Sequence, residues 1–119
     1  MQIFAPVTVT DARSLAGPTL EVTVSPGTEL VHEGHPLGTF FVIRSGTAEL
    51  RRCGRLVRVL HTGECFGEID AAAYRPQPYT VIAGAELRLL TFSTLGIGRM
   101  CTTLPHLRQR LLAALPGEE

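Results

Sequence analysis

Short apolar-rich segments separated by turns run from Leu20 to Phe92. Most of these segments end at or next to a glycine, and glycine supplies the positive φ angles that tight hairpins require. Several short strands with a turn signal at each end are typical of a sandwich or barrel. The expected strands are residues 20–24, 29–32, 39–44, 47–52, 55–60, 79–83 and 85–92.

Two segments depart from this pattern. Residues Phe40–Ile43 form one continuous apolar run, which predicts a central strand covered on both faces. Residues Glu68–Ala73 have helix propensity and little strand propensity, and prolines follow at positions 76 and 78. We therefore expect a single helical turn at about 68–73 between the strands.

The pattern becomes helical after Phe92. Ser93 or Thr94 can cap a helix over Leu95–Thr102, and Pro105 can open a second helix that ends at Pro116. Leucines recur in the second helix at positions 107, 111, 112 and 115, which is helical spacing. This stripe predicts packing on the chain's own strands and a monomer or weak homodimer. A short helical turn is also expected at about 11–16.

Composition and charge narrow the class of protein. Hydrophobic residues make up 45% of the 119 residues and charged residues 18%, which is typical of a globular chain. Eleven basic and eleven acidic residues cancel, so charge gives no argument for a nucleic-acid partner. We find no apolar run of membrane-spanning length and no signal-peptide pattern at the N-terminus. We expect a cytoplasmic protein without a membrane partner.

The three cysteines, Cys53, Cys65 and Cys101, are odd in number, and no pair has redox or zinc spacing. We expect free thiols in a reducing compartment, with zinc or iron–sulfur ligation as the alternative.

Histidines near one loop offer a metal site as a further alternative. His32, Glu33, His35 and His61 resemble the metal ligands of cupins, but the sequence has His-Glu-Gly-His where cupins have His-x-His followed by a glutamate. We expect turn and surface histidines and no bound metal. Serines and threonines have no histidine and aspartate partners at a recognisable spacing, so no catalytic residue is assigned and the chain is predicted not to be an enzyme.

Four arginines, Arg51, Arg52, Arg55 and Arg58, surround the Cys53-Gly54 turn. They predict a solvated hairpin face, with a docking surface for an acidic partner as the alternative.

Two stretches carry a family resemblance. Residues Pro26–Gly46 read PGTELVHEGHPLGTFFVIRSG and residues Gly63–Glu68 read GECFGE. Together they resemble the cyclic-nucleotide-binding domain of catabolite activator proteins and of the regulatory subunits of cAMP-dependent protein kinase. The resemblance covers roughly residues 18–92. It implies a mainly β fold: a β-barrel of the double-stranded β-helix or jelly-roll type, with a short cassette helix and two C-terminal helices. We expect one domain over 1–119, with the barrel at 18–92 and the helices at 93–115.

The resemblance also implies a site. The helical turn after Phe66 corresponds to the family's phosphate-binding cassette, in which backbone amides face an anion. Gly67 would let the backbone approach the ligand, Glu68 would accept a hydrogen bond from the ribose 2′-hydroxyl, and an arginine ten residues after the glycine would pair with the phosphate. The implied ligand is cAMP or cGMP, with no other cofactor. The Glu33-Gly34 pair of the resemblance further implies that the Glu33 carboxylate bonds backbone amides in its own loop. The candidate ligand-binding residues are Phe66, Gly67, Glu68, Ile69, Asp70, Arg75, Gln77 and Thr80.

The cassette departs from the family at several positions. Gln77 stands where the arginine belongs, and an amide offers neither its charge nor its bidentate fork. Asp70 replaces a small residue and adds negative charge, and Ala71 and Ala72 replace bulky aliphatic residues. Arg75, two residues before Gln77, is either a substitute for the missing arginine or an ordinary exposed side chain.

These features predict a regulatory domain in which cyclic-nucleotide binding is weakened or lost. Such a domain would sense a ligand or bind a protein, and it would act through a partner or a parent protein because the chain ends too soon for a helix-turn-helix. One alternative is a functional cyclic-nucleotide sensor that uses Glu68 with Arg75 or Gln77. The other is a cupin-like metal enzyme.

Overall fold

The computed structural model describes residues 20–70, 75–104 and 106–116. The helical turn expected at 11–16 and residues 71–73 of the turn expected at 68–73 lie outside the described residues. Residues Glu68–Asp70, at the start of the latter, have no regular secondary structure.

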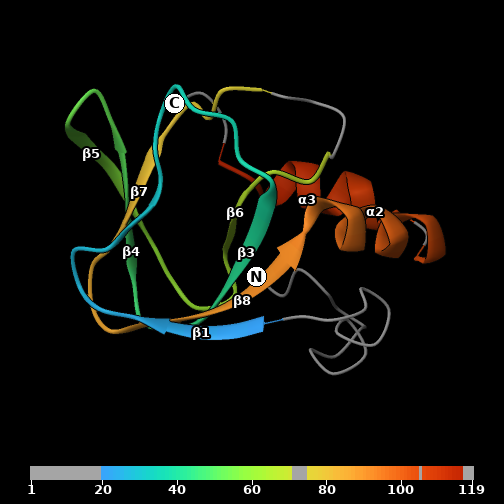
Figure 1. Cartoon of the computed structure of the whole chain (residues 1–119), viewed down its shortest axis with the longest axis horizontal. Helices are drawn as coiled ribbons and strands as arrows, with labels where there is room; N and C mark the ends of the chain where they lie inside the picture. The colour runs from blue at the N-terminus through green and yellow to red at the C-terminus, as the bar shows by residue number, and fades with distance from the viewer. Residues whose placement is uncertain (1–19, 71–74, 105, 117–119) are drawn as a thin grey trace.

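Two four-stranded antiparallel sheets form the body of the domain (Figure 1). The two sheets share no strand within the described residues, so the predicted jelly roll is an open sandwich and not a closed barrel. The first sheet has the order β1 (Leu20–Val24), β8 (Leu87–Ser93), β3 (Thr39–Ser45), β6 (Cys65–Gly67). The second has the order β2 (Glu29–Val31), β7 (Thr80–Ala83), β4 (Ala48–Arg52), β5 (Arg55–Leu60).

Two helices, α2 (Thr94–Thr103) and α3 (Leu107–Ala114), follow β8 and pack on the first sheet (Figure 1). The side chain of Ser93 caps α2 by accepting a hydrogen bond from the Gly96 amide at 3.0 Å. Leu107 and Leu111 of α3 are buried in a core that the helices share with β3 and β8. The prediction that the leucine stripe packs on its own chain is therefore confirmed for Leu107, Leu111 and Leu115, whereas Leu112 is exposed. No helix in the described ranges is long and apolar enough to cross a membrane.

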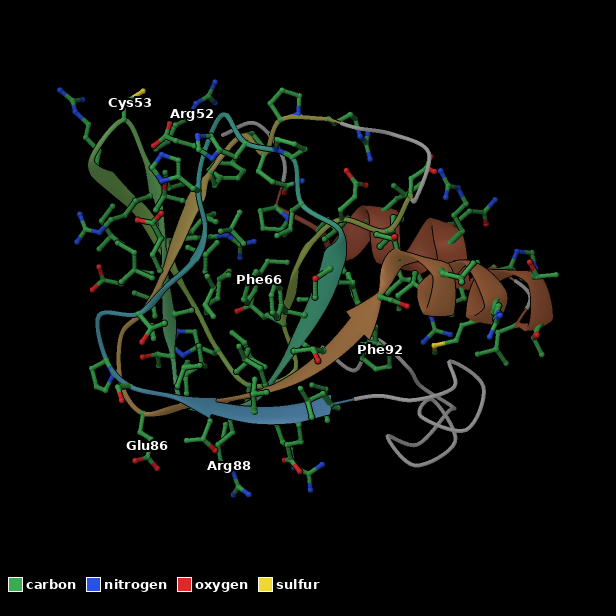
Figure 2. All side chains as sticks on the ribbon, in the orientation of Figure 1. Arg52, Cys53, Phe66, Glu86, Arg88 and Phe92 are labelled. Carbon is green, nitrogen blue, oxygen red and sulfur yellow. The ribbon has the colours of Figure 1, made fainter. Side chains whose placement is uncertain are left out.

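Strand β3 separates two hydrophobic cores, because its side chains alternate between the two faces of the sheet. Phe40 and Val42 pack toward the helices, whereas Phe41 and Ile43 pack between the sheets. All four side chains are buried, which confirms the central strand predicted from the apolar run. Figure 2 shows Phe66 pointing into the space between the sheets, while Glu86 and Arg88 point away from the body of the domain.

The seven expected strands are present with ends that shift by at most two residues. Strand β6 was not predicted, because a three-residue strand that ends at a glycine is indistinguishable from a turn in the sequence. It pairs with Phe40, Phe41 and Val42 of β3 and thereby adds a fourth strand to the first sheet.

Candidate functional site

Gly67 directs the chain out of the first sheet at the end of β6. Its φ angle is +105°, and a Cβ atom at this position would lie 2.5 Å from the Thr39 carbonyl oxygen. The same carbonyl accepts a hydrogen bond from the Glu68 amide at 3.0 Å. Only a residue without a side chain allows both this φ and this close approach. Gly67 therefore fixes where Glu68 enters the site.

Glu68 is a buried carboxylate, with 4% of the residue exposed. Its Oε2 atom accepts hydrogen bonds from the backbone amides of Ile69 and Asp70, each at 3.1 Å. The same oxygen forms an ion pair with Arg75 Nη2 at 2.8 Å. The hydrogen bond from Arg75 to Glu68 and the negative charge of the Glu68 carboxylate raise the pKa of Arg75. In the family resemblance, backbone amides of this segment face a ligand anion. Here the Ile69 and Asp70 amides face a carboxylate of the protein itself.

A cavity of about 320 Å³ lies beside Glu68, between the second sheet, the segment before β7 and the end of α3. This volume is at the lower end of the range for small-molecule pockets, roughly 300–1,000 Å³. Most of the lining is apolar, and Glu68 and Arg75 are its charged groups. The lining residues are Val31, Leu50, Phe66, Gly67, Glu68, Arg75, Pro76, Gln77, Pro78, Tyr79, Val81, Leu112, Leu115 and Pro116.

Gln77 lines this cavity from a backbone that is held on both sides. Its amide donates to the His35 carbonyl at 2.9 Å, and its carbonyl accepts from the Gly34 amide at 2.8 Å. Because these bonds involve only the main chain, they do not depend on the side chain at position 77. The Cα atom of a different residue at position 77 would therefore occupy the same place beside the cavity.

Five of the eight candidate residues meet at the cavity, namely Phe66, Gly67, Glu68, Arg75 and Gln77. The other three have different surroundings. The Ile69 side chain is buried in the core shared with the helices. The Asp70 carboxylate lies 3.8 Å from Arg108 Nη2 on α3. The Thr80 hydroxyl faces Glu33, at 3.4 Å from its Oε1.

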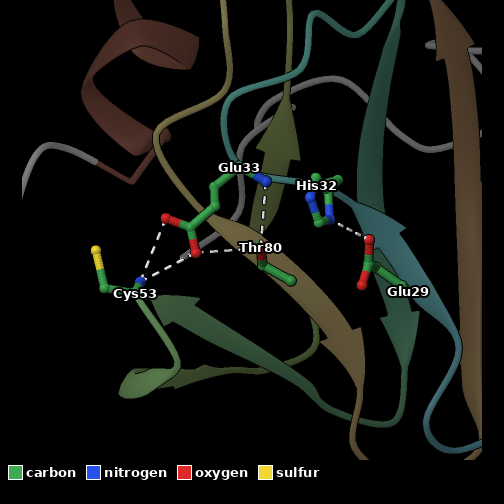
Figure 3. A network of polar contacts seen from close by, with 5 residues as sticks. All are labelled: Glu29, His32, Glu33, Cys53 and Thr80. Atoms are coloured by element: carbon green, nitrogen blue, oxygen red, sulfur yellow. Dashed lines mark hydrogen bonds and ion pairs between the residues drawn. The ribbon is translucent and has the colours of Figure 1, made fainter.

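Glu33, in the loop between β2 and β3, contacts the β4–β5 hairpin and the start of β7, which are distant from it in the sequence (Figure 3). Its carboxylate accepts from the backbone amide of Cys53, at the tip of the β4–β5 hairpin, at 3.0 and 3.3 Å. Its own amide donates to the Thr80 hydroxyl at 3.2 Å. The expectation that Glu33 bonds amides of its own loop was therefore wrong about the partner, because the folded hairpin brings residue 53 to it. Cys53 itself has a positive φ of 52°.

The histidines near this network serve local contacts. His32 directly precedes Glu33, and its Nδ1 atom lies 2.6 Å from Glu29 Oε1 (Figure 3). Across the described residues, no group of three or more histidine, cysteine, aspartate or glutamate side chains is arranged to hold a metal ion. The three cysteines are free thiols.

Carboxylates of the same chain engage arginines of the hairpin. Arg51 pairs with Glu49 at 2.7 Å and Arg58 with Glu64 at 3.0 Å. These pairs offset part of the positive charge that the sequence places on the hairpin.

The side of the cavity formed by α3 and the residues directly after it was missed in the sequence analysis. Leu112, Leu115 and Pro116 line the cavity, and Leu112 remains 46% exposed. Helical spacing indicated that one face of α3 is buried, but spacing alone does not say that a second face borders a cavity.

Comparison with known proteins identifies the fold and the family. The sequence profile of the cyclic nucleotide-binding domain matches residues 21–103. A cAMP-dependent protein kinase regulatory subunit from Yarrowia lipolytica is 30% identical over 102 residues, which are 83% of this chain and 27% of that protein. The chain thus spans about a quarter of the length of this relative.

Two crystal structures extend the comparison. The N-terminal domain of a transcriptional regulator from Streptomyces coelicolor A3(2) superposes with a TM-score of 0.70 at 27% identity, covering 94% of this chain and 84% of that one. The catabolite activator protein of Thermus thermophilus gives a TM-score of 0.78 at 19% identity, covering 93% of this chain and 55% of that one. The match to the profile extends over most of the chain, and the chain belongs to the cyclic nucleotide-binding domain family.

Proposed function

We propose that this chain is a regulatory, non-catalytic domain that binds cAMP or cGMP weakly in the cavity beside Glu68. The observation that carries the proposal is the position of Gln77, which lines the cavity and stands where the family resemblance requires the phosphate-binding arginine. Two other residues stand where the family resemblance implies them, Gly67 at the end of β6 and Glu68 directly after it.

Gln77 accounts for the weakness. An amide can donate one hydrogen bond to a phosphate oxygen, but it lacks the positive charge and the paired N–H groups of a guanidinium. Loss of one charged partner in a desolvated contact costs about 2–5 kcal/mol, which corresponds to roughly thirtyfold to several-thousandfold in affinity. We infer a dissociation constant for cAMP of about 10 μM or weaker.

The α3 helix supports a regulatory output. It contributes Leu112 to the cavity, the residues directly after it contribute Leu115 and Pro116, and it packs on the first sheet through Leu107 and Leu111. A ligand in the cavity would therefore touch an element that is near the end of the chain. A partner protein, or further sequence of a parent protein, would detect the ligand through this helix.

Titration of ¹⁵N-labelled protein with cAMP and with cGMP tests the proposal. Fast-exchange shifts should concentrate on amides around the cavity, at Phe66, Gly67, Gln77, Val81 and Leu112, and fit a dissociation constant of tens of micromolar or weaker. Submicromolar binding would show that Arg75 or the backbone holds the phosphate. Absence of shifts at millimolar nucleotide, or shifts confined to another face, would contradict nucleotide binding and favour a protein-interaction domain.

A further inference from the structure

Three N–H donors converge on one oxygen of Glu68. The Ile69 and Asp70 amides each lie 3.1 Å from Oε2, and Arg75 Nη2 lies 2.8 Å from it. Consecutive backbone amides together with a guanidinium are a donor set with which proteins bind phosphate or carboxylate anions. In this chain the anion at their focus is a side chain of the protein.

The carboxylate also separates the two backbone amides from the cavity. Glu68 and Arg75 line the cavity, whereas Ile69 and Asp70 do not. An anion that entered the cavity would thus meet the negative charge of Glu68 before it reached the two amides. Arg75 is the solvent-exposed member of the set, because its side chain is 60% exposed while that of Glu68 is 5% exposed.

We propose that Glu68 is an internal anion, which occupies the anion subsite of the cavity until the phosphate of a ligand displaces it. The displaced carboxylate turns to the ribose 2′-hydroxyl, and the phosphate takes the Ile69 and Asp70 amides and Arg75. This inference rests on the proposed function and adds a second cause of weak binding, besides Gln77. In this inference Arg75 pairs with the Glu68 carboxylate when the cavity is empty and with the phosphate when a ligand is bound.

A ligand without the 2′-hydroxyl isolates this competition. Such a ligand offers the displaced carboxylate no new hydrogen bond, so nothing offsets the competition between the carboxylate and the phosphate of the ligand. Removing the charge of Glu68 should therefore tighten binding of 2′-deoxy-cAMP, by about tenfold, the contribution expected of one charge-assisted hydrogen bond. For cAMP the gain is smaller, because the same change weakens the acceptor for the ribose hydroxyl.

The test is calorimetric titration of wild type and Glu68→Gln with 2′-deoxy-cAMP and, separately, with inorganic phosphate. Glu64→Gln is the matched control. The Glu64 carboxylate also accepts from an arginine, Arg58 at 3.0 Å, and from a backbone amide, that of His61 at 3.1 Å, but it does not line the cavity. Glu68→Gln should tighten both ligands and Glu64→Gln neither. Adding Arg75→Gln to Glu68→Gln should reverse the gain, because the guanidinium then no longer holds the phosphate.

The outcomes separate this inference from the proposed function. Unchanged or weaker binding of 2′-deoxy-cAMP and phosphate by Glu68→Gln, in a domain that binds cAMP, would overturn the internal anion and leave the proposed function in place. Tighter phosphate binding with no nucleotide bound by any variant would support the internal anion and overturn the proposed function. Glu68→Ala, which removes the acceptor as well as the charge, provides a second variant with the same expected sign.

Discussion

Replacement of Gly67 by alanine should destabilise the domain strongly at the junction between β3 and the site. The added Cβ would lie 2.5 Å from the Thr39 carbonyl oxygen and 3.3 Å from the Phe40 Cα, so it meets backbone and not the end of a flexible side chain. The φ of +105° is also one that residues with a side chain rarely adopt. Either the β6 backbone rotates or β3 moves away from it.

The expected magnitude combines two effects. A strained backbone conformation at a residue with a side chain costs about 1–3 kcal/mol. Displacement of the Thr39 carbonyl breaks its hydrogen bond with the Glu68 amide, 3.0 Å long, and an unsatisfied buried polar group costs about 1–3 kcal/mol. The sum is about 2–6 kcal/mol, a large part of the roughly 5–15 kcal/mol by which domains are stable.

Urea unfolding followed by circular dichroism measures this change. With a slope of about 1–3 kcal/mol per molar urea, the midpoint should fall by at least about 0.7 M. Gly98→Ala is the matched control, since a Cβ there meets nothing within 4 Å and Gly98 lies inside α2. That variant should gain about 0.5–1 kcal/mol from helix propensity. Equal midpoints for Gly67→Ala and wild type would refute the close approach of β6 to β3.

Three further variants test the caps, the hairpin contact and the core. Ser93→Ala should lose about 1 kcal/mol of unfolding free energy with the cap on the Gly96 amide; an unchanged urea midpoint would contradict the cap. Glu33→Gln should speed hydrogen exchange at the Cys53 amide, its charged acceptor being lost, and unchanged exchange would place that bond elsewhere. Burial, aided by the Glu64 charge, raises the pKa of Cys65 from 9.0 to about 12. As the pH rises, the thiol ionises in the unfolded chain before it ionises in the folded one, so the free energy of unfolding should fall between these pH values by up to about 1.4 kcal/mol per pH unit. Cys65→Ala should show a shallower fall of the unfolding free energy with pH, and identical slopes in the two proteins would argue against a buried thiol.

The strands and both C-terminal helices could be predicted because their signals are local. Phe40–Ile43 form an apolar run that only a strand with two covered faces can bury, and Ser93 precedes a segment with helical spacing. β6 escaped prediction because a three-residue strand depends on its partner, β3, and not on a pattern of its own.

The site was less predictable, because its contacts are set by tertiary structure. The family resemblance placed Gly67, Glu68 and Gln77 together, and all three line one cavity. That Arg75 reaches Glu68 follows from the burial of the carboxylate, which requires a charged partner. The contact between Glu33 and the Cys53 amide spans 20 residues of sequence, and nothing local in the pattern indicates it.

The affinity of Gln77→Arg for cAMP, measured by isothermal titration calorimetry beside wild type, tests the central claim most directly. The main chain at position 77 is held by the Gly34 amide and the His35 carbonyl, so the new guanidinium starts from the place of the amide. Gln109→Arg, on the exposed side of α3, adds the same charge away from the cavity and serves as the control. Gln77→Arg should bind cAMP at least about tenfold more tightly than wild type, and Gln109→Arg should not. Equal affinities of Gln77→Arg and wild type would contradict the claim that Gln77 is what weakens this site.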